Sequence, residues 1–198
     1  MADGGATPSR VQAGEAVLSV LVVAATEPEL CEHPGLACGI GPVEAASATA
    51  RELERDRPDA VLHVGLAGAV GLEPGTLVVG TEAVYADLAA AIPVVSRVEP
   101  DPKLFAAIRR AFPDAPALPI ATSAAVSGPG DTVSQGVLVE AMEGFGVLRA
   151  SELAGVPAIE VRAISNELGE PDRARWDLER GLEALADALP RLLAAVRE

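Results

Sequence analysis

Aromatic side chains are scarce in this 198-residue sequence: they make up 3% of it, as one tryptophan, one tyrosine and three phenylalanines. A core built on packed rings is therefore excluded, and Ala, Val, Leu and Ile must fill the interior. Apolar residues still account for 49% of the chain, and only 22% is charged. That balance excludes an intrinsically disordered protein. The length fits one domain with a sizeable hydrophobic core.

Positive charge is also in short supply, with 15 Lys and Arg against 29 Asp and Glu and a formal net charge of −14. A chain with this much negative charge repels the phosphates of nucleic acid, so nucleic acid is excluded as a general partner. The chain has no basic cluster or basic amphipathic helix, so we expect no membrane-surface partner either.

Cysteines and long hydrophobic runs are equally few. The chain has two cysteines, Cys31 and Cys38, which is too few for a typical secreted disulfide scaffold and favours a reducing cytoplasm. The first apolar run, Val17–Ala25, is too short to cross a bilayer and lacks the flanks of a signal peptide. Residues 1–16 are predicted to form a flexible tail before a single domain over 17–198.

The rest of the sequence alternates between strand and helix patterns. Val17–Ala25 is nearly continuous in β-branched and small apolar residues, which indicates a strand buried on both faces. A short irregular stretch leads to Pro42, whose ring suits a first helical turn, and a helix is expected over 43–57. Ala60–Val64 is predicted as a second buried strand that ends in a Gly-rich loop, 65–68.

Further strands are expected at 76–85, 117–123, 137–139 and 157–165, and further helices at 102–112, 144–154 and 174–196. Residues 127–135 are predicted to be a loop, Gly155 a helix C-cap, and Pro190 a bend or restart. The alternation predicts an α/β fold, a three-layer αβα sandwich with a central mixed, largely parallel sheet. In such folds, sites lie at the C-terminal ends of strands.

Several motifs that would indicate a particular chemistry are missing. The sequence has no GxxxxGK[ST] phosphate loop, no GxGxxG after a strand and no GxSxG elbow. The spacing of Cys31, His33 and Cys38 matches no standard zinc site, so no metal is expected. His63 lies within a predicted strand, where a buried structural histidine is the favoured interpretation.

Polar or Gly-rich segments do follow four predicted strands. They begin at Thr26, Gly65, Glu140 and Ser165, and in an open α/β sheet such ends can converge on one crevice. The segments supply carboxylates, an amide and Gly-lined backbone.

These segments resemble the nucleoside phosphorylase/nucleosidase superfamily. The resemblance lies in Val139-Glu-Ala-Met-Glu-Gly144 with Gly155-Val-Pro-Ala-Ile-Glu-Val-Arg-Ala-Ile-Ser-Asn166, and extends over roughly residues 17–197. Cys38-Gly-Ile-Gly-Pro-Val-Glu44 and Pro58–Gly68 are similar to two further family motifs, and Val22–Glu29 to its first strand and the acid that follows.

Within the superfamily, the sequence is most similar to the futalosine hydrolases, which release hypoxanthine from futalosine in a route to menaquinone. Asn166 stands where the adenine-specific nucleosidases carry an aspartate, and an amide suits a 6-oxopurine. Pro171–Asp177 also resembles the futalosine hydrolase tail. The segment Thr26–Glu29 has no counterpart of the phosphate-binding arginine of the phosphorylases, so water is the expected nucleophile.

The resemblance implies a role for each candidate residue, with no cofactor. Glu29 would act as general base on water, Glu143 would bind the ribose hydroxyls, and Asn166 would hydrogen-bond the departing base. Met142 would pack on the ribose, and Gly65, Leu66, Ala67 and Gly68 would line the base. It also implies a homodimer or larger homo-oligomer. The group on the 5′ side of the ribose is not specified.

Each of these residues also has a simpler structural explanation. Glu143 can stabilise a helix N-terminus without catalysis, and Asn166 can cap a turn. Met142 can fill the core, and Glu29 can be one solvated acid among many. Two alternatives for the whole protein follow: a nucleosidase for methylthioadenosine or S-adenosylhomocysteine, and a catalytically inactive nucleoside-binding relative. Only nine residues separate Glu29 from Gly39, a shorter excursion than the family pattern.

Overall fold

The computed structural model describes residues 18–88, 90–125 and 136–198. The predicted tail (1–16) and the predicted loop at 127–135 lie outside these residues. One eight-stranded sheet organises the described chain. Its strands are β1 (Val20–Ala24), β2 (Leu36–Ala37), β3 (Ala60–Ala69), β4 (Leu77–Tyr85), β5 (Arg97–Val98), β6 (Ala117–Thr122), β7 (Val139–Ala141) and β8 (Ala158–Glu167).

The sheet is mixed, as predicted. Strand β1 pairs in parallel with β2 and β3, β3 with β8, and β6 with β4 and β7, whereas β3–β7, β4–β5 and β4–β8 are antiparallel. Because β8 pairs with both β3 and β4, and β7 joins β3 to β6, the strands β3, β8, β4, β6 and β7 form a closed ring. This closure leaves few unpaired strand edges in the middle of the sheet.

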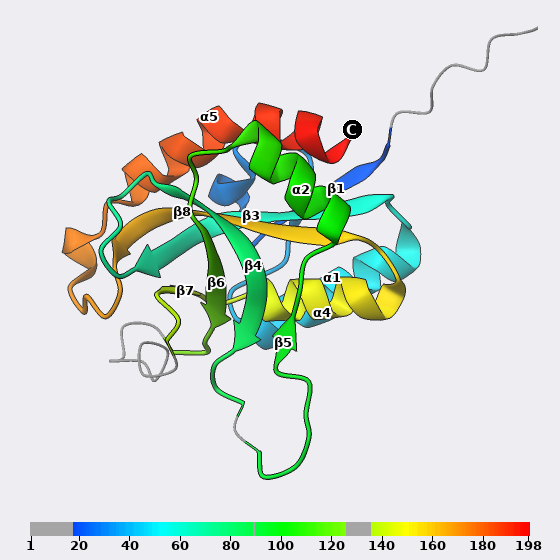
Figure 1. Cartoon of the computed structure of the whole chain (residues 1–198), viewed down its shortest axis with the longest axis horizontal. Coiled ribbons are helices and arrows are strands. Elements are labelled where there is room, and N and C mark those ends of the chain that lie inside the picture. Colours follow the sequence, from blue (N-terminus) through cyan, green and yellow to red (C-terminus); the bar gives the residue numbers. More distant parts are fainter. Residues whose placement is uncertain (1–17, 89, 126–135) are drawn as a thin grey trace, which may run out of the picture.

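Helices cover both sides of the sheet, which confirms the three-layer αβα architecture (Figure 1). Helices α2 (Pro102–Ala111) and α5 (Leu178–Val196) pack together on one side, and α1 (Pro42–Arg55) packs against α4 (Gly144–Ala154) on the other. The core on the α5 side is aliphatic, with Leu62, Ile108, Ile159, Leu185 and Leu192 at its centre. Among the described residues, no helix is both long enough and apolar enough to cross a membrane.

Capping residues fix where the helices begin and end. Asp101 accepts hydrogen bonds from the backbone N–H groups of Lys103 and Leu104 at the start of α2. Gly155 ends α4 with φ of 69°, as expected for the C-cap that the sequence predicts. Pro190 lies within α5 and does not end it. That helix begins at Leu178, later than predicted, because Asp177 caps it and a short 3₁₀ turn, η2 (Arg173–Arg175), precedes it.

The largest difference from the sequence prediction is at residues 65–68. We expected a loop there, but β3 continues to Ala69 and β8 continues to Glu167. Both extensions are stabilised because β3 is paired with β8 from Val61 to Ala69 and with β7 at its end. The predicted strand at 137–139 is likewise shifted to Val139–Ala141. Strands β2 and β5, two residues each, are too short to give a sequence pattern.

Candidate active site

A pocket of about 410 Å³ lies where β1, β3 and β8 end and where β7 leads into α4. Its wall contains Glu29, Met142, Glu143 and Asn166, together with Leu66–Gly68. The sequence therefore predicted correctly that the polar strand ends converge. Three of these segments meet here because the parallel pairing of β1, β3 and β8 places their carboxyl ends at one edge of the sheet. The fourth, which carries Met142 and Glu143, lies beside them because β7 pairs antiparallel with the end of β3.

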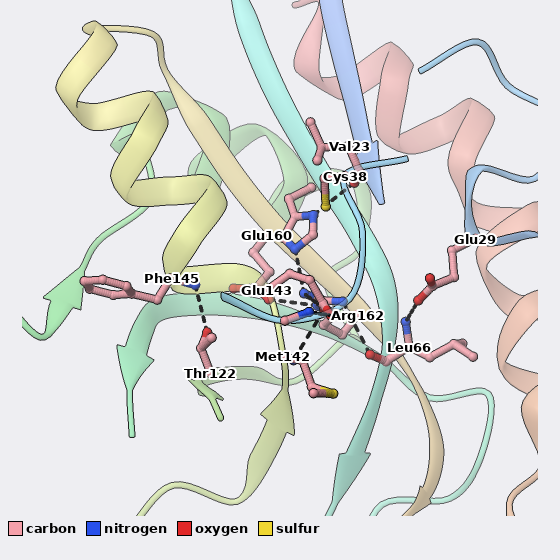
Figure 2. Close-up of polar contacts among 12 residues, drawn as sticks. Val23, Glu29, Cys38, Leu66, Thr122, Met142, Glu143, Phe145, Glu160 and Arg162 are labelled. Atoms are coloured by element: carbon pink, nitrogen blue, oxygen red, sulfur yellow. Dashed lines mark hydrogen bonds and ion pairs between the residues drawn. The ribbon is translucent and has the colours of Figure 1, made fainter. Parts of the chain in front are cut away.

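Glu29 lies in the 3₁₀ turn η1 (Glu27–Leu30), directly after β1. Its carboxylate accepts hydrogen bonds from the Thr26 backbone N–H at 3.0 Å and the Thr26 hydroxyl at 2.7 Å. Its other oxygen, Oε1, accepts the backbone N–H of Leu66 at 2.9 Å. The short excursion after Glu29 therefore does not displace it from the pocket: Thr26 and β3 hold it there, as Figure 2 shows for the bond to Leu66.

Glu143 occupies the N-cap position of α4 and is 4% exposed. Its Oε1 accepts the backbone N–H of Gly41 at 3.2 Å, and its Oε2 accepts the backbone N–H of Met142 and an N–H of Arg162, both at 3.3 Å. Nothing in this arrangement is a side-chain cap of α4, because the carboxylate bonds to no N–H of its own helix. Simple helix capping therefore does not account for this carboxylate.

Asn166 is near the end of β8 and is 8% exposed. Its Oδ1 accepts the Ser165 hydroxyl at 2.8 Å, and its Nδ2 donates to the Glu167 carbonyl at 3.0 Å. These bonds fix the amide against the pocket wall instead of capping the turn before Pro171. Nδ2 carries two hydrogens and has one acceptor among the described residues, so its second N–H can bind a ligand.

The Gly-rich segment makes room for side chains, which differs from what the sequence predicted. Gly65 does not line the pocket: it lies behind it, and a Cβ there would overlap with Arg162 and come within 2.9 Å of Glu29 Oε1. A Cβ on Gly68 would lie 2.8 Å from Nδ2 of Asn166. Of the predicted base-lining residues, Leu66, Ala67 and Gly68 do form wall of the pocket.

Arg162 is the central residue that the sequence analysis did not select. Its side chain is fully buried, and Nε donates to Glu160 Oε1 at 2.8 Å. One terminal nitrogen donates to Glu143, and the other reaches the Leu66 carbonyl at 3.4 Å (Figure 2). The nitrogen that donates to Glu143 also donates to Nε2 of His63. A charged pair two residues apart, within the otherwise apolar run 156–164, was the available signal, because charges are rarely buried without a partner.

His63 is a structural histidine, as predicted, although it also contacts Arg162. Its Nδ1 donates to the Val23 carbonyl at 2.9 Å, so Nε2 is the acceptor for Arg162 at 2.5 Å. Burial and the neighbouring guanidinium hold the pKa of His63 well below 6.5, so the ring is neutral. Burial and the Glu143 carboxylate raise the pKa of the Cys38 thiol to about 12, so this thiol is protonated at neutral pH.

Comparison with known proteins identifies the architecture. A model of the phosphorylase superfamily matches residues 12–198. The chain belongs to the phosphorylase superfamily. It is 36% identical to a futalosine hydrolase of Streptomyces coelicolor over 79% of this chain and 77% of that one. It is also 35% identical to a futalosine hydrolase of Thermus thermophilus, over 80% of each chain.

Solved structures of other proteins share this fold. A methylthioadenosine/S-adenosylhomocysteine nucleosidase of Colwellia psychrerythraea, in complex with adenine, has a TM-score of 0.80 with 21% identity over 92% of this chain and 97% of that one. A futalosine hydrolase of Helicobacter pylori has a TM-score of 0.79 with 18% identity, covering 90% of this chain and 98% of the other.

The single tryptophan and the single tyrosine of this phosphorylase-superfamily chain lie in different places relative to the pocket. Trp176 lines the pocket, where its indole N–H donates to the Glu170 carbonyl and the Arg173 guanidinium lies 5.2 Å from its ring. Tyr85 instead stacks on Phe145 and does not line the pocket. Within the described parts of the chain, no group of three or more His, Cys, Asp or Glu side chains is arranged to hold a metal ion.

Proposed function

We propose that this protein is a hydrolase that cleaves the N-ribosidic bond of a 6-oxopurine nucleoside. The favoured substrate is futalosine, which would give hypoxanthine and dehypoxanthine futalosine in menaquinone biosynthesis. The similarity to futalosine hydrolases over about four-fifths of the chain supports this assignment. The observation that carries it is the convergence of Glu29, Glu143 and Asn166 on one pocket.

Electrostatics supports a role for Glu143 at the sugar. Breaking a ribosyl–purine bond builds positive charge on the ribose in the transition state. Catalysis requires that the enzyme stabilise this transition state more than the ground state. Glu143 and Glu160 both bond to one guanidinium, that of Arg162, Glu29 is near enough to interact with it electrostatically, and His63 is neutral. The carboxylate of Glu143 would bind the ribose hydroxyls and favour the cationic sugar, with Met142 beside it.

Glu29 suits a general base because it is held in place and still has an acceptor position. A carboxylate offers about four lone-pair sites. The two donors from Thr26 both bind Oε2, and the Leu66 N–H binds Oε1. One site on Oε1 therefore remains to accept a proton from water, which would attack the anomeric carbon as the C–N bond breaks.

Asn166 would stabilise the departing base and favour a 6-oxopurine over adenine as that base. The leaving purine gains negative charge, which an N–H donor at N7 stabilises. The Asn166 amide has one N–H that is not used by Glu167, and it can donate without supplying a proton. A 6-oxopurine leaves more readily as an anion than adenine, so a hydrogen-bond donor is enough.

A methylthioadenosine/S-adenosylhomocysteine nucleosidase is the second candidate. The fold match to such enzymes and 28% identity to one from Chromohalobacter salexigens favour it, whereas Asn166 speaks against it. Incubation with futalosine, inosine and methylthioadenosine, followed by chromatography of free base, separates the candidates. We expect hypoxanthine from futalosine. Adenine alone would support the second candidate, and purine binding without release of any base would support an inactive relative.

We further propose that the protein acts in the cytoplasm as a single-domain subunit of a homodimer or larger homo-oligomer. The composition and the family resemblance support this. Light scattering measures the mass in solution, and a monomer at micromolar concentration would contradict the proposed assembly.

A further inference from the structure

The side chain of Glu160 is the least explained group near the pocket. It is 1% exposed and lies on β8, two residues before Arg162 and on the same face of the strand. Its Oε1 accepts Nε of Arg162, but within the described part of the chain its Oε2 has no hydrogen-bond partner. Burial raises the pKa of this carboxyl, opposed by the attraction of Arg162. Burying a carboxylate oxygen without a hydrogen-bond partner costs free energy, so we expect this side chain to have a role.

The position of this carboxyl connects it to the start of α4. A Cβ on Gly144 would overlap with both oxygens of Glu160, so no side chain fits at residue 144 while Glu160 stays in place. Gly144 directly follows Glu143. Glu160 thus fills the space behind the proposed ribose-binding residue.

Arg162 links the two carboxylates. Its guanidinium is planar, so a bond from Nε to Glu160 fixes the plane in which the terminal nitrogens point. Those nitrogens reach Glu143, His63 and the carbonyl of Leu66. The bond of Arg162 to Glu143, at 3.3 Å, is longer than its bond to Glu160, at 2.8 Å. Glu160 therefore shares the charge of Arg162 and leaves more negative charge on Glu143.

We propose that Glu160 is a positioning residue that acts through Arg162 to orient Glu143 and keep its negative charge directed at the ribose, with Gly144 providing the space. This inference rests on the proposed function for the role of Glu143. It adds a residue that lies outside the pocket wall. Without the Glu160 charge, Arg162 turns to Glu143 and neutralises it.

Glu160→Gln is the direct kinetic test, because it keeps the shape and removes the charge. We expect kcat for base release to fall about tenfold or more while KM changes less than about threefold, since the lost stabilisation concerns charge that develops in the transition state. The matched control is Thr49→Val, which removes a second buried oxygen that has no partner among the described residues, in α1 and away from the pocket. The control should leave both constants unchanged. Equal kcat in wild type and Glu160→Gln would overturn the proposal.

Binding provides a readout that does not require turnover. The probes are 9-deazainosine, whose C–C glycosidic bond cannot be hydrolysed, and its 2′-deoxy form, measured by calorimetry. If Glu143 is held toward the ribose, the wild type should prefer the ribose form by about tenfold. In Glu160→Gln, that preference should shrink severalfold. No ribose preference in the wild type, or an unchanged one in the variant, overturns the proposal. A preference that depends on Glu160 without any base release leaves it standing and refutes only the proposed reaction.

If Glu160→Gln does not fold, the wild-type protein still decides the question. With ¹⁵N-labelled arginine, the Nε–H of Arg162 should exchange with solvent far more slowly than those of the exposed arginines, because Glu160 holds it in a buried bond. Its chemical shift should respond to 9-deazainosine more than to the 2′-deoxy form. Fast exchange of that N–H, or equal responses to the two probes, would overturn the proposal.

Discussion

Gly65 and Arg162 are register partners on the adjacent parallel strands β3 and β8, and the guanidinium of Arg162 occupies the space that a side chain at residue 65 would need. The same glycine lies against Glu29 Oε1. One missing Cβ thus permits the close approach of the arginine and a proposed catalytic acid. The sequence predicts that residues 65–68 form a loop facing a ligand. At residue 65, the glycine instead leaves room for two charged side chains to pack.

Gly65→Ala should therefore remove activity and destabilise the protein. The new methyl forces Arg162 or Glu29 to move, and overpacking at a buried position costs about 1–3 kcal/mol. Thermal unfolding and the rate of base release measure the two effects. Gly155→Ala is the matched control: it strains the C-cap of α4, at φ of 69°, in open space away from the pocket. It should lower the melting temperature yet keep its specific activity. Full activity in Gly65→Ala would refute this account of the glycine.

Glu143→Gln should strongly slow base release while the protein stays folded. The substitution keeps the size of the side chain but removes the negative charge that would face the cationic ribose. We expect kcat/KM to fall by about a hundredfold or more. Glu152→Gln is the comparison, because it removes a half-exposed partner of Arg149 on the same helix, and a surface pair of this kind contributes little. Unchanged activity in Glu143→Gln would remove Glu143 from the mechanism.

Asn166→Asp should change which purine is released. A protonated aspartic acid can pass its proton to N7 of adenine, whereas the amide can only donate a hydrogen bond. We expect the ratio of kcat/KM for methylthioadenosine to that for futalosine to rise at least about tenfold. The Gly68 backbone leaves the same space for either side chain. A ratio that does not move would show that base selection lies elsewhere in the pocket.

His63 should make folding stability depend on pH. Its pKa is held well below 6.5 in the folded protein, so on acidification the unfolded chain takes up a proton that the folded one refuses. The contribution of the neutral ring is complete above about pH 6.5 and is lost as the pH falls toward the folded-state value, at up to about 1.4 kcal/mol per pH unit. Urea unfolding of wild type and His63→Gln between pH 7.5 and 5.5 measures it. Wild type should lose stability more steeply, and parallel curves would contradict this.

The sequence predicted the alternation of strands and helices and, except for Gly65, the candidate residues that meet in the pocket, because both depend on local patterns. The apolar runs predicted β1, β3 and β8, and the polar residues that follow these runs include Glu29 and Asn166. The extension of β3 through Gly65–Gly68 could not be predicted, since it depends on pairing with β8 and β7.

The same limit explains why Arg162 and Glu160 were not selected. Their importance depends on the register that places them beside Gly65 and His63 across the sheet. A sequence pattern shows that the two charges share one face of a strand. It does not show that this face is buried against a glycine that makes room for a guanidinium.

The most direct test of the proposed hydrolysis is to incubate the protein with futalosine in H₂¹⁸O, with and without phosphate, and to analyse the products by mass spectrometry. We predict free hypoxanthine at the same rate in both buffers and one ¹⁸O atom at the anomeric carbon of the sugar product. Glu29→Gln should not catalyse this reaction, because the amide of glutamine cannot accept a proton from water. Intact futalosine, or a sugar phosphate formed only when phosphate is present, would contradict the assignment.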